Sequence, residues 1–285
     1  MSRFVAVAVA SLTFFVVAAC GKASAAPAPT AQAAPPAALV LPIPPREHAA
    51  ERPPEGWCGE TAIQEGLLHL GVWAPQRLIN KVGRPAHPDL YSTDIPVALT
   101  ELGVRYTFYP GGRGFDAFAA WIRAALEAGD PVLAGVKILP TKHPEWGLDH
   151  FVLVVGYSGG KEAGTDRLLV NTTWGHREWV SDTTTPGLSF AKAGYAIRLS
   201  GLAMTRESAR AARLSVLEES DATVRVHVVC SGLEKGASYT IERRGSRGDP
   251  KPVWALDAVA AGDRIERDVT VEADRASRFQ CVPRR

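Results

Sequence analysis

Gly56-Trp-Cys-Gly-Glu-Thr-Ala-Ile-Gln-Glu-Gly-Leu-Leu-His-Leu70 is the stretch around which the chain is organised. Its apolar residues Ile63, Leu67 and Leu70 recur at helical spacing after a Pro/Gly-rich approach, so the pattern predicts a helix that begins at Cys58. The exposed N–H groups and the macrodipole at that end of a helix favour a thiolate over a thiol. We therefore interpret Cys58 as a nucleophile, which requires a base, an orienting residue and oxyanion donors elsewhere in the chain.

The composition is that of a globular protein. The chain has 285 residues, of which 46% are hydrophobic and 22% charged, with a formal net charge of +2, so one or two domains are expected. It has no long basic run interleaved with aromatic residues, which argues against nucleic-acid binding. His87, His143 and His176 fall in predicted loops without metal-ligand spacing to the cysteines, so neither a metal site nor another cofactor is expected.

The N-terminal residues predict export. Apolar and small residues run without interruption from Phe4 to Ala19, which is short for a membrane-spanning helix and the right length for a signal-peptide core. The run ends in Val17-Ala-Ala-Cys-Gly21, which resembles the bacterial lipobox. By that resemblance residues 1–19 are a lipoprotein signal peptide, and Cys20 is lipidated and anchors the protein in the bacterial cell envelope. Cleavage near Ala23-Ser-Ala25 is the alternative, and it would give a secreted protein.

Residues 20–46 are rich in alanine and proline, carry little charge and show no periodicity. Such a composition predicts a semi-extended tether without a core of its own. A lipid-anchored protein needs a spacer of this kind to hold its folded part clear of the membrane.

Two of the four cysteines are expected to form a disulfide. Cys230 and Cys281 lie in alternating, strand-like stretches, and export places them in an oxidising compartment. Pairing them leaves Cys58 as the odd thiol of the folded region, which favours a reactive role for it.

The segments after the first helix alternate between helical and strand patterns before turning wholly to strands. His150 opens one strand and Asn171 ends the next, and neighbouring antiparallel strands bring two such ends together. The Asn171 amide oxygen could then accept a hydrogen bond from one ring nitrogen of His150. The predicted helices are 75–81, 95–102 and 115–126, and the predicted strands are 104–109, 132–136, 149–157, 167–170 and 193–199. The last three are expected to form an antiparallel meander.

Three motifs in this order resemble the papain-like cysteine peptidases, and most closely the bacterial branch related to the double-glycine, bacteriocin-processing peptidases. They are GWCGETA at 56–62, DHFVLVVGY at 149–157 and NTTWG at 171–175. The resemblance implies a papain-like α+β domain over residues 47–201, with N-terminal helices packed on an antiparallel sheet. It further implies a peptide or protein substrate and the roles of nucleophile for Cys58, general base and acid for His150, orienter for Asn171, and shield of the His–Asn hydrogen bond for Trp174.

The chain departs from the family at the oxyanion hole. The family carries a glutamine about six residues before the nucleophile, and here that position is Arg52. The backbone N–H of Cys58 and the Arg52 guanidinium are therefore the candidate donors. Since loss of one donor typically costs about 10²–10³ in rate, two alternatives to an amide-cleaving hydrolase stay open. One is an acyltransferase or amidase that uses the same thioester, and the other is an inactive, peptide-binding pseudoenzyme.

Residues 202–285 alternate apolar and polar residues in short runs separated by Gly and Asp turns, which predicts a small, all-β sandwich. A sandwich of this size needs support, which the Cys230–Cys281 disulfide would give. This region carries no candidate catalytic set, so we expect an accessory domain that packs on the catalytic domain or binds a protein partner.

Overall fold

Antiparallel sheets and a few helices make up the part of the chain that the structure describes. The computed structural model describes residues 38–48, 56–112, 114–138, 145, 147–159, 167–182, 188–190, 194–203, 209–245 and 252–284. The predicted signal peptide, the predicted lipidation site Cys20 and the predicted donor Arg52 lie outside these residues. The mixture of helices with antiparallel strands confirms the α+β class.

The helices are α1 (Cys58–His69), α2 (Gln76–Gly83), α3 (Ile95–Glu101) and α4 (Gly114–Glu127). The strands of the first sheet are β1 (Ala38–Val40), β3 (Val104–Phe108), β4 (Val132–Val136), β5 (His150–Ser158), β6 (Arg167–Asn171), β7 (Arg177–Val180) and β8 (Ala196–Leu202). The strands of the second are β2 (Val72–Trp73), β9 (Arg210–Glu219), β10 (Thr223–Ser231), β11 (Ser238–Arg244), β12 (Trp254–Val259), β13 (Arg264–Glu272) and β14 (Ser277–Pro283).

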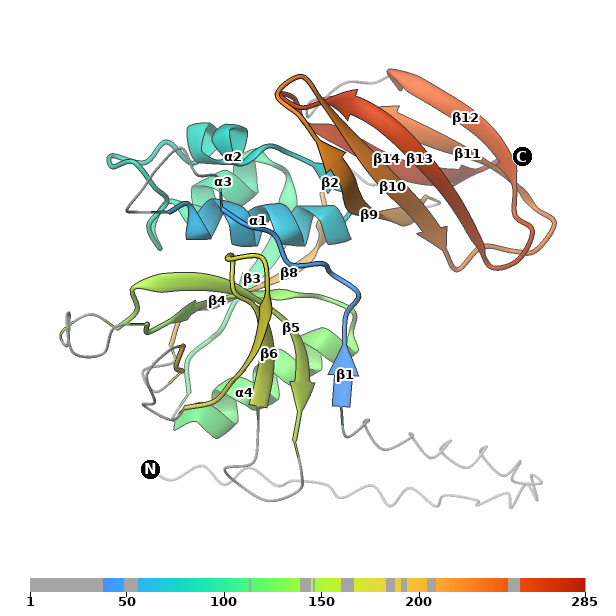
Figure 1. Cartoon of the computed structure of the whole chain (residues 1–285). Coiled ribbons are helices and arrows are strands. Elements are labelled where there is room, and N and C mark those ends of the chain that lie inside the picture. Colours follow the sequence, from blue (N-terminus) through green and yellow to red (C-terminus); the bar gives the residue numbers. More distant parts are fainter. Residues whose placement is uncertain are drawn as a thin grey trace, which may run out of the picture. The chain divides into compact units, whose positions relative to one another are not determined.

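The first sheet has the strand order β3-β8-β4-β5-β6-β7, and β1 pairs with β5. β5 is the central strand because its apolar residues, buried along almost its whole length, pair with β4 and β1 as well as with β6. Helices α1 and α4 both contact β5 and lie on opposite sides of the sheet (Figure 1). The sheet therefore forms the middle layer between α1 and α4.

Helix α1 is buried along nearly its whole length. It begins at Cys58, as the sequence predicts, and Gly66 lets it approach the sheet closely. A Cβ atom at Gly66 would lie 2.4 Å from the Cδ1 of Leu199 on β8, so a larger residue would push the helix outward. This close packing fixes the N-terminus of α1, and with it Cys58, against the sheet.

Two sequence-based expectations about this region are wrong. The tether does not extend to residue 46, because Ala38–Val40 forms β1 on β5 and both Leu41 and Ile43 are buried. The apolar residues of this proline-rich segment gain more from burial than an exposed spacer would. Nor does the strand near residues 193–199 follow β6 in a meander: β8 pairs with β3 and β4, while the unpredicted β7 pairs with β6.

The second sheet has the order β12-β11-β14-β9-β10-β13, with β2 paired to β14. The predicted disulfide is confirmed, because Cys230 on β10 and Cys281 on β14 are bonded and fully buried. Leu68 at the end of α1 and Trp73 on β2 pack into the same apolar core as these cysteines. The end of α1 and the residues that follow it thus contribute to the core of the C-terminal sheet.

Within the described ranges, no helix is long and apolar enough to cross a membrane.

Candidate active site

Cys58 and His150 line one pocket of ≈ 890 Å³. It lies at the end of the first sheet where β5 begins, and the segments that follow β4 and β6 form part of its wall. Trp174, which the sequence also singles out, lines it too. The remaining lining residues are His48, Gly56, Asp89, Leu90, Tyr91, Ser92, Ile138, Gly147, Leu148, Asp149 and Phe151.

The Cys58 sulfur is held at the first residue of α1. The side chain is partly exposed, and Sγ accepts hydrogen bonds from the backbone N–H groups of Phe151 and Gly59. Burial nevertheless raises the pKa of the Cys58 thiol to about 12, and the negative charges of Glu60 and Asp89 add to that rise. This direction is opposite to the one expected of a helix N-terminus, because desolvation outweighs the two N–H groups.

His150 is the first residue of β5, and its ring is oriented by the turn that follows β6. Nε2 lies 3.0 Å from the carbonyl oxygen of Thr172 and 3.3 Å from Oγ1 of Thr173. Because a carbonyl oxygen only accepts, Nε2 carries the proton in this arrangement and Nδ1 is left as the basic nitrogen. Burial lowers the pKa of His150 to about 4, so the ring is neutral at pH 7 and available as a base. Trp174 stacks on it with 4.6 Å between ring centroids.

Asn171 does not take the position of the orienter. Its Nδ2 donates to the carbonyl of Ile43 at 3.1 Å, its Oδ1 accepts from Nε of Arg177 at 3.1 Å, and its side chain also bonds Glu65. Among the described contacts none joins Asn171 to His150. The reason is the register: Asn171 pairs with Leu153, three residues beyond His150, and alternate residues of a strand point to opposite faces.

The turn after Asn171 provides the orienting group instead. Thr173 has a φ of 68°, a left-handed conformation that is unusual for a β-branched residue. It brings the Thr172 carbonyl and the Thr173 hydroxyl to His150. Such sparsely populated backbone conformations are enriched at active sites, which is consistent with a candidate site here. No residue-type signal in the sequence identifies a backbone carbonyl as the partner of His150.

The Cys58 backbone N–H is engaged in this structure. It donates to the carbonyl of Gly56 at 2.9 Å. Of the two donors predicted for the oxyanion hole, one is thus occupied and the other, Arg52, lies outside the described residues.

A buried ion pair supports the wall beside His150. Nζ of Lys137 lies 2.9 Å from Oδ2 of Asp149, and the two side chains are 3% and 7% exposed. Oδ1 of Asp149 accepts the backbone N–H of Ile138 at 2.7 Å, so the carboxylate joins the end of β4 to the start of β5. The position of Asp149 directly before His150 was the only sequence signal for this pair.

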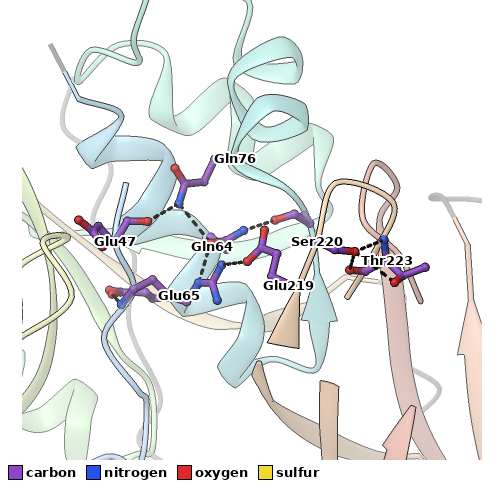
Figure 2. A network of polar contacts seen from close by, with 9 residues as sticks. Glu47, Gln64, Glu65, Gln76, Glu219, Ser220 and Thr223 are labelled. Carbon is purple, nitrogen blue, oxygen red and sulfur yellow. Dashed lines mark hydrogen bonds and ion pairs between the residues drawn. The ribbon is translucent and has the colours of Figure 1, made fainter. Parts of the chain in front are cut away.

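A polar network behind α1 links the two sheets (Figure 2). Gln64 and Glu65 project from α1 toward Arg46, which also pairs with Glu219 on β9. Gln76 extends the network by donating to Oε1 of Gln64 at 3.3 Å. A larger pocket, of ≈ 1030 Å³, is lined by members of this network. It contains neither Cys58 nor His150, so the smaller pocket is the candidate active site.

Glu65 gives this network a pH-dependent contribution to stability. The side chain is fully buried, which raises its pKa to about 8, and its Oε2 has no hydrogen-bond partner among the described residues. An unfolded glutamate titrates near 4.3, so between these pH values the folded protein holds a proton that the unfolded chain has lost. Folding stability attributable to Glu65 is therefore lost as the pH rises toward 8, by up to about 1.4 kcal/mol per pH unit.

We expect Glu65→Gln to remove this dependence. The free energy of unfolding of this variant, measured by urea titration, should be equal to or slightly below that of the wild type at pH 5. At pH 9 it should be higher than that of the wild type. Glu218→Gln, at an exposed position on β9, is the matched control and should leave the wild-type dependence intact. Parallel pH curves for wild type and Glu65→Gln would show that Glu65 is ionised in the folded protein.

Comparison with known proteins found no matching family model and no matching curated protein. In the described part of the chain, no three His, Cys, Asp or Glu side chains are grouped so that they could hold a metal ion.

Proposed function

We propose that this protein is an exported, papain-like thiol hydrolase that cleaves an amide bond in a peptide or protein through an acyl-thioester on Cys58. The observation that carries the proposal is the pairing in one pocket. Sγ of Cys58 accepts the N–H of Phe151, and the residue before it, His150, commits its Nε2–H to the Thr172 carbonyl. A thiol and a correctly protonated base thus lie in one pocket.

The reaction starts from the neutral thiol of Cys58 and the neutral imidazole of His150. As Sγ attacks the substrate carbonyl carbon, Nδ1 of His150 takes the thiol proton and the carbonyl electron pair moves to oxygen. The imidazolium then gives that proton to the leaving amine, and the acyl-thioester remains. Water, deprotonated by His150, attacks the thioester and releases the acid with the free thiol.

One alternative is favoured by specific observations. The high pKa of the thiol and the engaged N–H of Cys58 both suit a peptide-binding protein without catalysis. An acyltransferase or amidase would use the same thioester and differ only in the acceptor, so product analysis with added amines separates it from a hydrolase.

The proposed function also assigns roles to the remaining segments of the chain. Residues 47–201 carry the proposed hydrolase, extended at the N-terminal side by β1. Residues 202–285 form an accessory domain for which a protein partner is proposed. The lipobox-like sequence at Cys20 supports an anchor in the bacterial cell envelope, with secretion as the alternative.

Acylation of Cys58 by p-nitrophenyl acetate tests the proposal. The wild type should release p-nitrophenolate in a burst of about one equivalent, and mass spectrometry of the quenched protein should place the acetyl group on Cys58. Cys58→Ala should show neither the burst nor the adduct. If the wild type behaves like Cys58→Ala, the site is inactive and the binding alternative holds.

A further inference from the structure

His48 is a second histidine in the Cys58 pocket, and the catalytic steps above do not use it. Its backbone is fixed beside the turn that orients His150. The His48 N–H donates to the Thr173 carbonyl at 3.0 Å, and the preceding residue, Glu47, forms a β-bridge with Trp174. The side chain is therefore attached to the same turn that holds the base.

The His48 ring packs directly against the backbone that leads to the nucleophile. A Cβ atom at Gly56 would lie 2.4 Å from both Nδ1 and Cε1 of His48, so a side chain at that position would collide with the ring. Gly56 precedes Cys58 by two residues. Glycine at 56 thus makes room for the imidazole beside the backbone two residues before Cys58, in the pocket that both side chains line.

The ring has hydrogen-bonding capacity that the folded chain does not use. Nδ1 of His48 is buried and has no partner among the described residues, and none of the described hydrogen bonds involves the other ring nitrogen. A neutral imidazole always has one N–H to donate. Since Nδ1 lies against Gly56 without an acceptor among the described residues, the favoured tautomer carries the proton on Nε2, and that N–H can donate to a bound acceptor.

The other groups expected to bind the oxyanion are not free to do so here. The Cys58 N–H donates to Gly56, and Nε2 of His150 donates to Thr172. The N–H groups of Phe151 and Gly59 point at the sulfur rather than at an attacked carbonyl.

We infer that His48 is the oxyanion donor of this site and takes the role that a glutamine side chain has in the papain-like peptidases. The inference rests on the proposed function. When the C–S bond forms, the carbonyl π electrons move to oxygen, and the imidazole N–H of His48 donates to that oxygen. Collapse of the intermediate returns the electrons and expels the leaving group with its bonding pair.

Two reagents separate an oxyanion donor from a merely structural histidine. Acylation by p-nitrophenyl acetate passes through a tetrahedral oxyanion, whereas alkylation by iodoacetamide displaces iodide at a saturated carbon and forms none. His48→Phe keeps a flat ring but has no donor, and His48→Gln supplies an amide donor. His227→Phe, on the exposed face of β10, is the matched control.

We expect His48→Phe to slow acylation by on the order of 10²-fold while alkylation changes less than about threefold. His48→Gln should retain acylation within about tenfold of the wild type, and His227→Phe should match the wild type in both reactions. Equal acylation in His48→Phe and the wild type would overturn the role of His48 and leave the proposed function standing. An equal loss in both reactions would show a structural role instead and equally overturn it. Absence of acylation in the wild type would remove the proposed function and this inference together.

Discussion

Replacing His150 with alanine is expected to slow acylation of Cys58 by about 10²–10⁴-fold at pH 7, the range typical of a positioned general base. The expected size of this effect follows from the neutral thiol of the resting protein. With the pKa of the thiol raised to about 12, very little thiolate forms without help, so attack depends on proton transfer to Nδ1. The burst rate with p-nitrophenyl acetate measures the loss directly.

His69 provides a matched control for that substitution. It lies at the opposite end of α1, burial lowers its pKa to about 4 as it does that of His150, and it likewise bonds a backbone carbonyl, that of Gly129 at 2.8 Å. His69→Ala should reduce folding stability but leave the burst rate of the folded protein within about threefold. Equal burst rates in wild type and His150→Ala would remove His150 from the mechanism.

The neutral thiol and the neutral imidazole together determine the pH dependence of acylation in the wild type. The reactive form has a neutral thiol and a neutral imidazole, so acylation should stay nearly constant from about pH 5 to pH 10. It should fall as the pH drops through about 4, where His150 becomes protonated and can no longer accept the thiol proton. A rate that instead rose tenfold per pH unit across the neutral range would indicate a thiol that ionises without a base.

Removal of the disulfide is expected to have the largest effect on stability. The bond between Cys230 and Cys281 closes a loop with a sequence separation of 51, for which chain entropy alone gives about 4 kcal/mol. The double variant Cys230→Ala, Cys281→Ala should therefore unfold with a free energy about 2–5 kcal/mol lower, measured by urea titration.

The effect should extend beyond the C-terminal sheet. Leu68 and Trp73 pack in the core that this disulfide crosses, and both lie close in sequence to the end of α1. Cys58→Ala, which keeps the disulfide, is the control and should change stability by less than about 1 kcal/mol. A double variant as stable as this control would mean that the sheet holds its core without the cross-link.

The helices and the central strands were predictable from sequence because their residues carry the signal locally. The start of α1 at Cys58, β4 and β5 follow from apolar spacing, flanking glycines and β-branched runs. The sequence placed β1 in the tether because proline and alanine dominate its surroundings. Its pairing with β5 is a tertiary contact that no local pattern encodes.

The site was predictable from sequence only where residue type and order carry the signal. Residue type and order identified Cys58, His150 and Trp174, which the structure brings to one pocket. Asn171 was singled out by type and position, but strand alternation turns its side chain toward Glu65. The group that orients His150 is a backbone carbonyl placed by a left-handed threonine, and His48 enters through a β-bridge between distant segments. Neither arrangement depends on a recognisable motif.

Whether Cys58 and His150 act as one unit is tested most directly by the rate of Cys58 alkylation with iodoacetamide from pH 5 to pH 10, in wild type and His150→Ala. We expect the wild type to alkylate readily throughout this range. In His150→Ala, alkylation should be slow at pH 5–7 and rise with each pH unit as thiolate forms. Slow alkylation with the same pH dependence in both proteins would contradict the paired thiol and base.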